Sequence, residues 1–217
     1  MSPPLSDEIL ARHRDVWEAM QAHRFVRDIE NDRLDPAVFR RYLVYEHSFV
    51  AAAITIFGHA LVRAPGLAEQ RWLIGVLGGL AHDQVDYFRR AFAALGMAEP
   101  DPEARLPAAV GAFRDGMLSL AAHGTFLDIV SAMFAAEWMY WTWCSRAAAR
   151  PISDPMVKQW VDLHAADAFA AQARWLKYRV DAGGAGLPPA GRERAGRVFR
   201  RALELEIDFH AAPYLGA

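Results

Sequence analysis

Three glutamates of this chain stand among apolar residues at helical spacing. The run SAMFAAEWMYWTWC, residues 131–144, contains one charged side chain, Glu137. Glu46 lies where the apolar part of RYLVYEHSFVAAAITIF begins, and Glu206 lies in FRRALELEIDFHAAPY. An ionised carboxylate in an apolar setting is costly unless it is paired or hydrogen-bonded. Two carboxylates in one dry pocket would raise each other's pKa and suit general acid–base chemistry.

The last of these segments contains its own internal contrast. Glu204 shares a helical face mainly with charged residues, whereas Glu206 shares its face with apolar and aromatic ones. The apolar face comprises Phe199, Ala202, Leu203, Phe209 and His210. We therefore expect Glu204 to face solvent and Glu206 to face the core.

Other interpretations of these residues stay open from the sequence alone. Glu137 could pair with an arginine from another helix, and Glu46 could be a boundary carboxylate in solvent. His164 shares a face with Trp160, and a lone histidine there is more often a satisfied core residue than a catalyst. Phe113 is most simply a core aromatic. If the three glutamates meet, they line one pocket between helices.

Helices must position these residues, because strand signals are nearly absent. Proline, glycine and capping residues predict about seven helices in one all-α domain, residues 1–217. The first helix is expected to start at Ser6, and the second, capped by Asp35, covers Pro36–Val62. The third runs from Gly66 to Gly96, and the fourth from the segment LPAAVGAF to the segment HGT. The last three run from Thr125 or Gly124 to RPISDP, from Pro155 to DAGGAG, and from LPPAGRER to about Ala211.

Composition excludes several classes of protein. The net charge of −2 and the lack of a basic run give no indication of nucleic-acid binding. No uncharged apolar run reaches the length of a membrane span, and the first residues lack the apolar segment of a secretory signal. A single cysteine, Cys144, excludes an intrachain disulfide and favours a cytoplasmic location.

Several segments, taken in order, resemble the TenA, or thiaminase II, family of thiamine metabolism. They are RFVRDIENDRLDPAVFRRYLVYEHSFV, FAALGM, PAAVGAFRDGML, DIVSAMFAAEWMYW, QWVDLHAADAF and LELEIDFH. Each is mostly apolar, so the specificity lies in their order and spacing across most of the chain. The resemblance implies a haem-oxygenase-like helical bundle, a homodimer or homotetramer, no cofactor, and a small-molecule aminopyrimidine substrate.

The resemblance also implies roles for individual residues. The family hydrolyses aminopyrimidines or cleaves thiamin, and a glutamate in a pattern like E-x-x-F-W serves as acid and base. Here that segment reads E-I-D-F-H, which gives the role to Glu206. Glu46 matches the family aspartate that binds the ring nitrogen and amino edge of the pyrimidine, a contact suited to charge-assisted hydrogen bonds. Tyr42, on the same face, completes the expected lining.

The departures from the family pattern concern the nucleophile. The better-known branch has a cysteine in P-C-x-W-x-Y, where this chain reads F-A-A-E-W-M-Y and places Ala136, with Glu137 beside it. Tyr140 is retained. Three tyrosine positions of that branch are occupied by Phe49, Phe113 and His164.

This chain resembles a second branch, which lacks the cysteine and uses a glutamate. That branch salvages aminopyrimidine or N-formyl-aminopyrimidine breakdown products. We accordingly expect Glu137 to replace the thiolate and a water activated by a carboxylate to attack the substrate.

Two other functions remain as alternatives. A di-iron oxidase of the same fold needs about six histidine and carboxylate ligands, commonly including Glu-x-x-His, which does not occur in this chain. The nearest substitutes are the pairs His82/Asp86 and Glu206/His210, which would have to be completed by Glu46, Glu137 and His164. A haem site would have to use His13 or His23, which nothing else marks. The second alternative is a non-catalytic protein that binds a pyrimidine-like ligand.

Overall fold

The chain folds into helices joined by short connections. The computed structural model describes residues 3–101 and 104–215, and every regular element in those ranges is helical. The prediction of an all-α protein is confirmed.

The N-terminal half contains α1 (Leu5–Arg12), α2 (Arg14–Gln21), α3 (Arg24–Glu30), α4 (Pro36–Val62), α5 (Leu67–Gly79) and α6 (Val85–Ala94). A turn of π-helix, η1 (Leu80–Gln84), joins α5 to α6. The C-terminal half contains α7 (Ala108–His123), α8 (Phe126–Ala148), α9 (Pro155–Ala165), α10 (Asp167–Gly184), α11 (Pro189–Ala211) and a 3-10 turn, η2 (Ala212–Tyr214).

Side-chain caps fix the starts of three helices at the predicted places. The Asp35 carboxylate accepts the backbone N–H of Ala37 at 2.7 Å, with Pro36 in the first turn of α4. Thr125 and Asp128 form a reciprocal capping box at the start of α8. Asp154 accepts two backbone N–H groups at the start of α9. These caps satisfy donors that have no partner within the helix.

Three segments differ from the expected seven helices. The first is divided into α1, α2 and α3. The third is interrupted by the π-helical turn at Leu80–Gln84. The sixth breaks at Ala166, whose ψ of 155° is extended. The segment HAADAF contains neither proline nor glycine, so the sequence has no local signal for that break.

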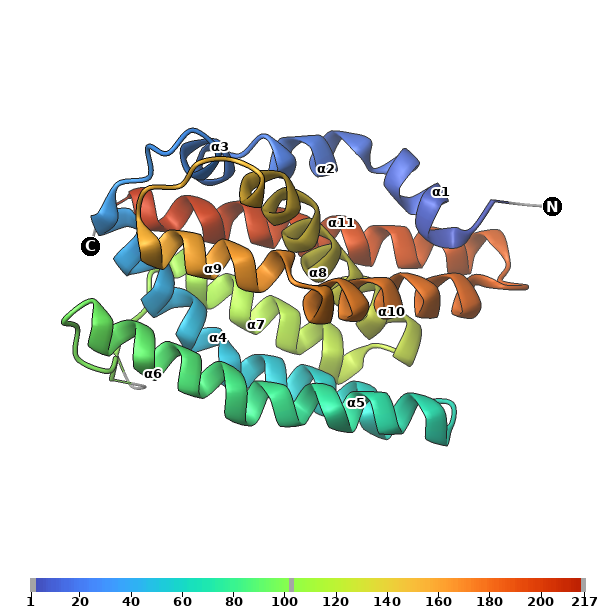
Figure 1. Ribbon diagram of the computed structural model, residues 1–217. Coiled ribbons are helices and arrows are strands. Elements are labelled where there is room, and N and C mark those ends of the chain that lie inside the picture. The colour runs from blue at the N-terminus through green and yellow to red at the C-terminus, as the bar shows by residue number, and fades with distance from the viewer. Residues whose placement is uncertain (1–2, 102–103, 216–217) are drawn as a thin grey trace.

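The packing places α8 against α9, α10 and α11, while α4 packs against α5 and α7. In Figure 1, α1 to α3 lie along one side of the bundle and α4, α5 and α6 lie along the opposite side. One hydrophobic core includes residues from α1 to η2. Among the described residues, no helix is long and apolar enough to cross a membrane.

Candidate active site

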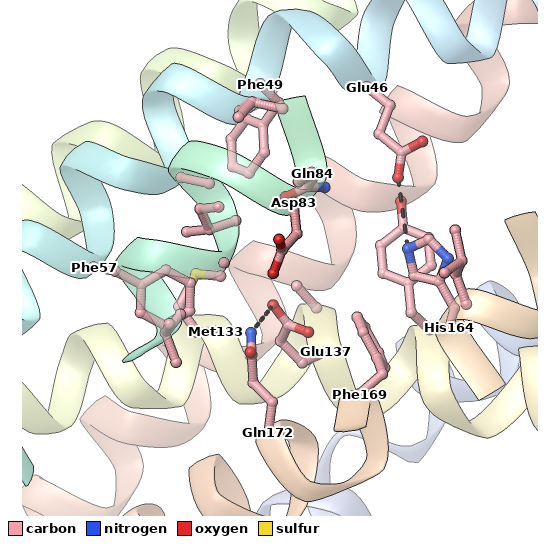
Figure 2. A pocket seen from close by; sticks show the side chains of 18 of the residues that line it. Glu46, Phe49, Phe57, Asp83, Gln84, Met133, Glu137, His164, Phe169 and Gln172 are labelled. Atoms are coloured by element: carbon pink, nitrogen blue, oxygen red, sulfur yellow. Dashed lines mark hydrogen bonds and ion pairs between the residues drawn. The ribbon is translucent and has the colours of Figure 1, made fainter. Parts of the chain in front are cut away.

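A cavity of about 530 Å³ lies between the helices, and all three predicted glutamates line it. It receives side chains from α4, the α5–η1–α6 segment and α7 to α11. Figure 2 shows Glu46 and Glu137 on different sides of this space. The lining also includes four of the predicted binding residues, namely Phe49, Phe113, Tyr140 and His164.

Glu46 is held by a tryptophan and faces a histidine. The Trp160 indole N–H donates to Glu46 Oε2 at 2.7 Å, and His164 Nε2 lies 3.7 Å from Glu46 Oε1. The side chain of Glu46 is 11% exposed, so the interpretation as a solvated boundary residue is wrong. Burial raises the pKa of Glu46 to about 8, although the hydrogen bond from Trp160 opposes this shift.

His164 is an uncharged member of the site. Its Nδ1 lies 2.8 Å from the backbone carbonyl of Trp160, an acceptor, so Nδ1 carries the proton and Nε2 presents a lone pair. Burial lowers the pKa of His164 to about 4. A protonated Glu46 can therefore donate toward His164 Nε2, while an ionised Glu46 can accept from a ligand.

Glu206 is the most deeply buried carboxyl group of the site. Its side chain is 1% exposed, and Oε2 has no hydrogen-bond partner among the described residues. Burial raises the pKa of Glu206 well above its ordinary value, and the charges of Glu46 and Glu137 add to the effect. Glu204 is half-exposed and pairs with Arg200 at 2.9 Å. The contrast predicted between Glu204 and Glu206 is confirmed.

The neighbouring histidine does not neutralise Glu206. His210 Nδ1 lies 2.8 Å from the Glu206 backbone carbonyl and 3.5 Å from the carboxylate. Burial, reinforced by His23, lowers the pKa of His210 to about 3, so the imidazole is uncharged. The raised pKa of Glu206 favours its protonated form, which can act as a general acid.

Glu137 has one engaged oxygen and one free oxygen. Gln172 Nε2 donates to Glu137 Oε1 at 3.0 Å, while the buried Oε2 has no partner in the described part of the chain. Among those residues no arginine forms an ion pair with Glu137, so the alternative in which Glu137 pairs with an arginine from another helix is wrong. Burial raises the pKa of Glu137 to about 7. Ala136, its neighbour, also lines the cavity.

Tyr42 does not line the cavity, contrary to expectation. It is fully buried, and its hydroxyl lies 2.9 Å from that of Tyr140, which does line the cavity. Tyr42 therefore lies behind Tyr140, and its hydrogen bond to Glu46 also acts to lower the pKa of that carboxyl group.

Aromatic rings form one wall of the cavity. Phe49 and Phe113 have centroids 4.5 Å apart, and Phe113 and Phe209 have centroids 4.8 Å apart. Phe113 is both buried in the core and part of the lining. Such a wall suits a flat aromatic ligand.

The α5–η1–α6 segment contributes lining residues that were not predicted from the sequence. Their numbers follow a spacing of three and four along the segment: Trp72, Gly75, Val76, Gly79, Leu80, Asp83, Gln84, Tyr87 and Phe88. This helical spacing could have predicted which face of the segment lines the cavity. No sequence pattern predicts the role of Gln172, which donates to Glu137, because that contact depends on how α10 packs against α8.

Of the pairs weighed as ligands of a di-iron site, Glu206/His210 lies at the cavity but His82/Asp86 does not. His82 and Asp86 are exposed and lie outside the cavity lining, and Asp86 pairs with Arg89 at 2.9 Å. Within the described ranges, no group of three or more His, Cys, Asp or Glu is arranged to hold a metal ion.

The fold and site define a class: a haem-oxygenase-like helical bundle that encloses an acidic, aromatic-walled pocket. A domain from Shewanella denitrificans with a heme oxygenase-like fold superposes with a TM-score of 0.72 at 10% identity, covering 96% of this chain and 91% of that one. The model of the TENA/THI-4/PQQC family matches residues 10–216, and the chain belongs to that family.

Individual relatives agree with this assignment. An aminopyrimidine aminohydrolase from Halalkalibacterium halodurans is 25% identical over 202 residues, covering 92% of this chain and 90% of the relative. A TenA homologue from P. horikoshii OT3 has a TM-score of 0.89 at 16% identity, covering 99% of this chain and 100% of that one.

Proposed function

We propose that this protein is a cofactor-free hydrolase of aminopyrimidine or N-formyl-aminopyrimidine breakdown products of thiamin, acting in thiamine salvage. The observation that carries the proposal is the pair of unpartnered buried carboxyl oxygens, Glu206 Oε2 and Glu137 Oε2, on residues that line one cavity. The similarity to a relative named aminopyrimidine aminohydrolase supports the substrate class.

In this proposal the wall of Phe49 and Phe113 holds the pyrimidine ring, and Glu46 binds the ring nitrogen and amino edge. The raised pKa of Glu46 does not prevent this contact, because a cationic aminopyrimidine favours the ionised carboxylate. Tyr140 and His164 complete the polar lining, and Tyr42 positions Tyr140.

The proposed reaction uses water as the nucleophile. Glu137, with a pKa of about 7, takes a proton from water while the water oxygen bonds to the ring carbon that bears the amino group. Glu206 gives its proton to the departing nitrogen, the C–N bond breaks, and ammonia and a hydroxypyrimidine result. With a formyl substrate, the same water adds to the formyl carbonyl and releases formate and an amine.

The test compares Glu206→Gln with Glu204→Gln, a matched change on the same helix at a half-exposed position. Purified proteins are incubated with 4-amino-5-aminomethyl-2-methylpyrimidine, its N-formyl derivative and thiamin, and ammonia, formate and pyrimidine products are measured. We expect wild type and Glu204→Gln to be active and Glu206→Gln to lose at least about a hundredfold in rate.

Full activity in Glu206→Gln would overturn the acid–base assignment. Tight binding without turnover by the wild type would favour the non-catalytic ligand-binding protein. A cytoplasmic homodimer or homotetramer is part of the same proposal, and light scattering of the purified protein tests its oligomeric part.

A further inference from the structure

Three residues that line the cavity each carry a buried polar atom without a partner among the described residues. The atoms are Glu137 Oε2, Glu206 Oε2 and the hydroxyl oxygen of Tyr87. The proposed reaction gives roles to the two carboxyl groups, as base and acid, but none to the phenol. Because a buried polar group without a partner costs free energy, the Tyr87 hydroxyl points to a contact that only a ligand completes.

The packing of α6 holds the Tyr87 ring in place. Tyr87 lies in the first turn of α6, directly after the π-helical turn, and is only 8% exposed. Its ring meets that of Phe88 edge to face with centroids 5.4 Å apart, and Phe88 in turn packs against His47. The ring is thus anchored in the hydrophobic core while it lines the cavity.

The Tyr87 phenol is associated with the Glu46 side of the cavity. Burial raises the pKa of Tyr87, and the charge of Glu46 adds to that shift, whereas Glu137 and Glu206 do not contribute to it. Since charge interactions weaken with distance, this indicates that Tyr87 lies closer to Glu46 than to the other two glutamates. Figure 2 shows Glu46 and Glu137 on different sides of the space. With its raised pKa, the phenol keeps its proton near neutral pH and is a hydrogen-bond donor.

The ligand of the proposed function has one polar atom that the site has not matched. A pyrimidine contains two ring nitrogens, and Glu46 binds one of them together with the amino group. The second nitrogen keeps its lone pair and needs a donor. The wall of Phe49 and Phe113 offers none, and the indole N–H of Trp160 is already bonded to Glu46. An ionised carboxylate accepts hydrogen bonds only, so it cannot serve either.

We propose that Tyr87 is a specificity-determining residue whose hydroxyl donates a hydrogen bond to the ring nitrogen that Glu46 leaves free. The inference rests on the proposed function and deepens it: the site recognises a ring with two nitrogens and discriminates against a similar ring with one. The hydroxyl has no partner in the described protein to give up, so the new bond breaks no other within the site.

Calorimetric binding of two probes tests this contact without relying on turnover. The probes are 4-amino-2-methylpyrimidine and 2-amino-6-methylpyridine, which share the amino group, the methyl group and the ring nitrogen between them and differ in the second nitrogen. The proteins are Glu206→Gln, in which hydrolysis is expected to be slow, and the same variant with Tyr87→Phe added. We expect Tyr87→Phe to reduce the preference for the pyrimidine about tenfold, through weaker binding of the pyrimidine alone. Comparing the two proteins cancels any difference in basicity between the probes.

Tyr45→Phe in the same background is the matched control, because Tyr45 is a buried tyrosine that does not line the cavity. It should keep the preference for the pyrimidine. A change of less than about twofold in Tyr87→Phe would assign the contact to another donor, such as the lining residue Gln84, and would overturn the inference. Equal weakening of both probes would show a role in packing alone and would also overturn it.

The ligand-free protein supplies a second test. Tyr87→Phe removes a hydroxyl that has no partner among the described residues, so the melting temperature should not fall. A clear fall would show that the hydroxyl is already engaged in the free protein, which contradicts its assignment to a ligand.

The two proposals fail in different ways. Hydrolysis of aminopyrimidines by the wild type, combined with an unchanged preference in Tyr87→Phe, leaves the proposed function standing and removes the role of Tyr87. A Tyr87-dependent preference in a protein whose wild type hydrolyses nothing removes the proposed function and retains the contact with the ring. Failure to bind either probe contradicts both.

Discussion

Trp160 donates its indole N–H to Glu46 Oε2 at 2.7 Å, and its backbone carbonyl accepts from His164 Nδ1 at 2.8 Å. One residue of α9 therefore orients both a carboxylate of α4 and an imidazole of its own helix. The hydrogen bond to Glu46 stabilises the ionised form, which is the form that can hold a cationic ring edge.

Replacing Trp160 by Phe should weaken substrate binding more than it slows the chemical step. Without the indole N–H, the pKa of Glu46 rises further and the carboxylate loses its fixed orientation. We expect KM to increase about tenfold with kcat changed less, as for loss of one hydrogen bond to a charged group. Steady-state kinetics measure the split, and Trp17→Phe, outside this cavity, is the control. An unchanged KM would contradict the role assigned to Trp160.

Glu137→Gln should stabilise the ligand-free protein more at pH 8 than at pH 5. The folded protein holds the Glu137 proton up to a pKa of about 7, whereas the unfolded chain releases it near 4.5. Stability from this group is thus full below pH 4.5 and is lost as the pH rises toward 7. The difference in free energy of unfolding between Glu137→Gln and the wild type should therefore shift in favour of the variant by about 2 kcal/mol from pH 5 to pH 8.

Urea unfolding at each pH measures this difference between variant and wild type. Glu204→Gln, at a half-exposed position, should show no such trend. A difference that does not change with pH would mean that Glu137 titrates in the folded protein as it does in the unfolded chain.

Tyr140→Phe and Tyr42→Phe should separate ligand contact from positioning. Both substitutions remove the same 2.9 Å hydrogen bond, but only Tyr140 lines the cavity. We expect kcat/KM to fall about tenfold in Tyr140→Phe and less than about threefold in Tyr42→Phe. Equal losses would contradict a direct contact of Tyr140 with the ligand and would assign the effect to the hydrogen bonds of Tyr42 with Tyr140 and Glu46.

Dialysis against a chelator should leave hydrolysis unchanged, because the proposed step uses carboxylates and water. The measurement is the rate before and after EDTA treatment, together with metal analysis of protein purified from iron-supplemented cells. A loss of rate that Fe(II) restores would favour the oxidase alternative, with ligands other than the exposed pair His82 and Asp86.

Much of this architecture could be predicted because its signals are local. Asp35, Thr125 and Asp154 mark helix starts through caps that act within three residues. The three glutamates were found by helical spacing alone, which fixes the face of a side chain without knowledge of the neighbouring helix.

The remaining features depend on contacts between distant segments. The break at Ala166 has no proline or glycine, and Gln172 and Trp160 acquire their roles only when α10 and α9 pack near α8 and α4. The position of Tyr42 behind Tyr140 likewise follows from the packing of α4 and α8. Helical spacing placed Tyr42 on the same helix face as Glu46 but could not show that Tyr140 separates it from the cavity.

The lone thiol of the chain lies beyond the reach of reagents. Cys144 is fully buried, and burial, with the nearby Glu46 charge, raises its pKa well above the ordinary value. A protonated, enclosed thiol is a poor target for alkylating agents, peroxide or mixed-disulfide formation. A carboxylate at the site in place of a thiolate would therefore make the activity insensitive to thiol oxidation, and iodoacetamide would leave the folded form unlabelled.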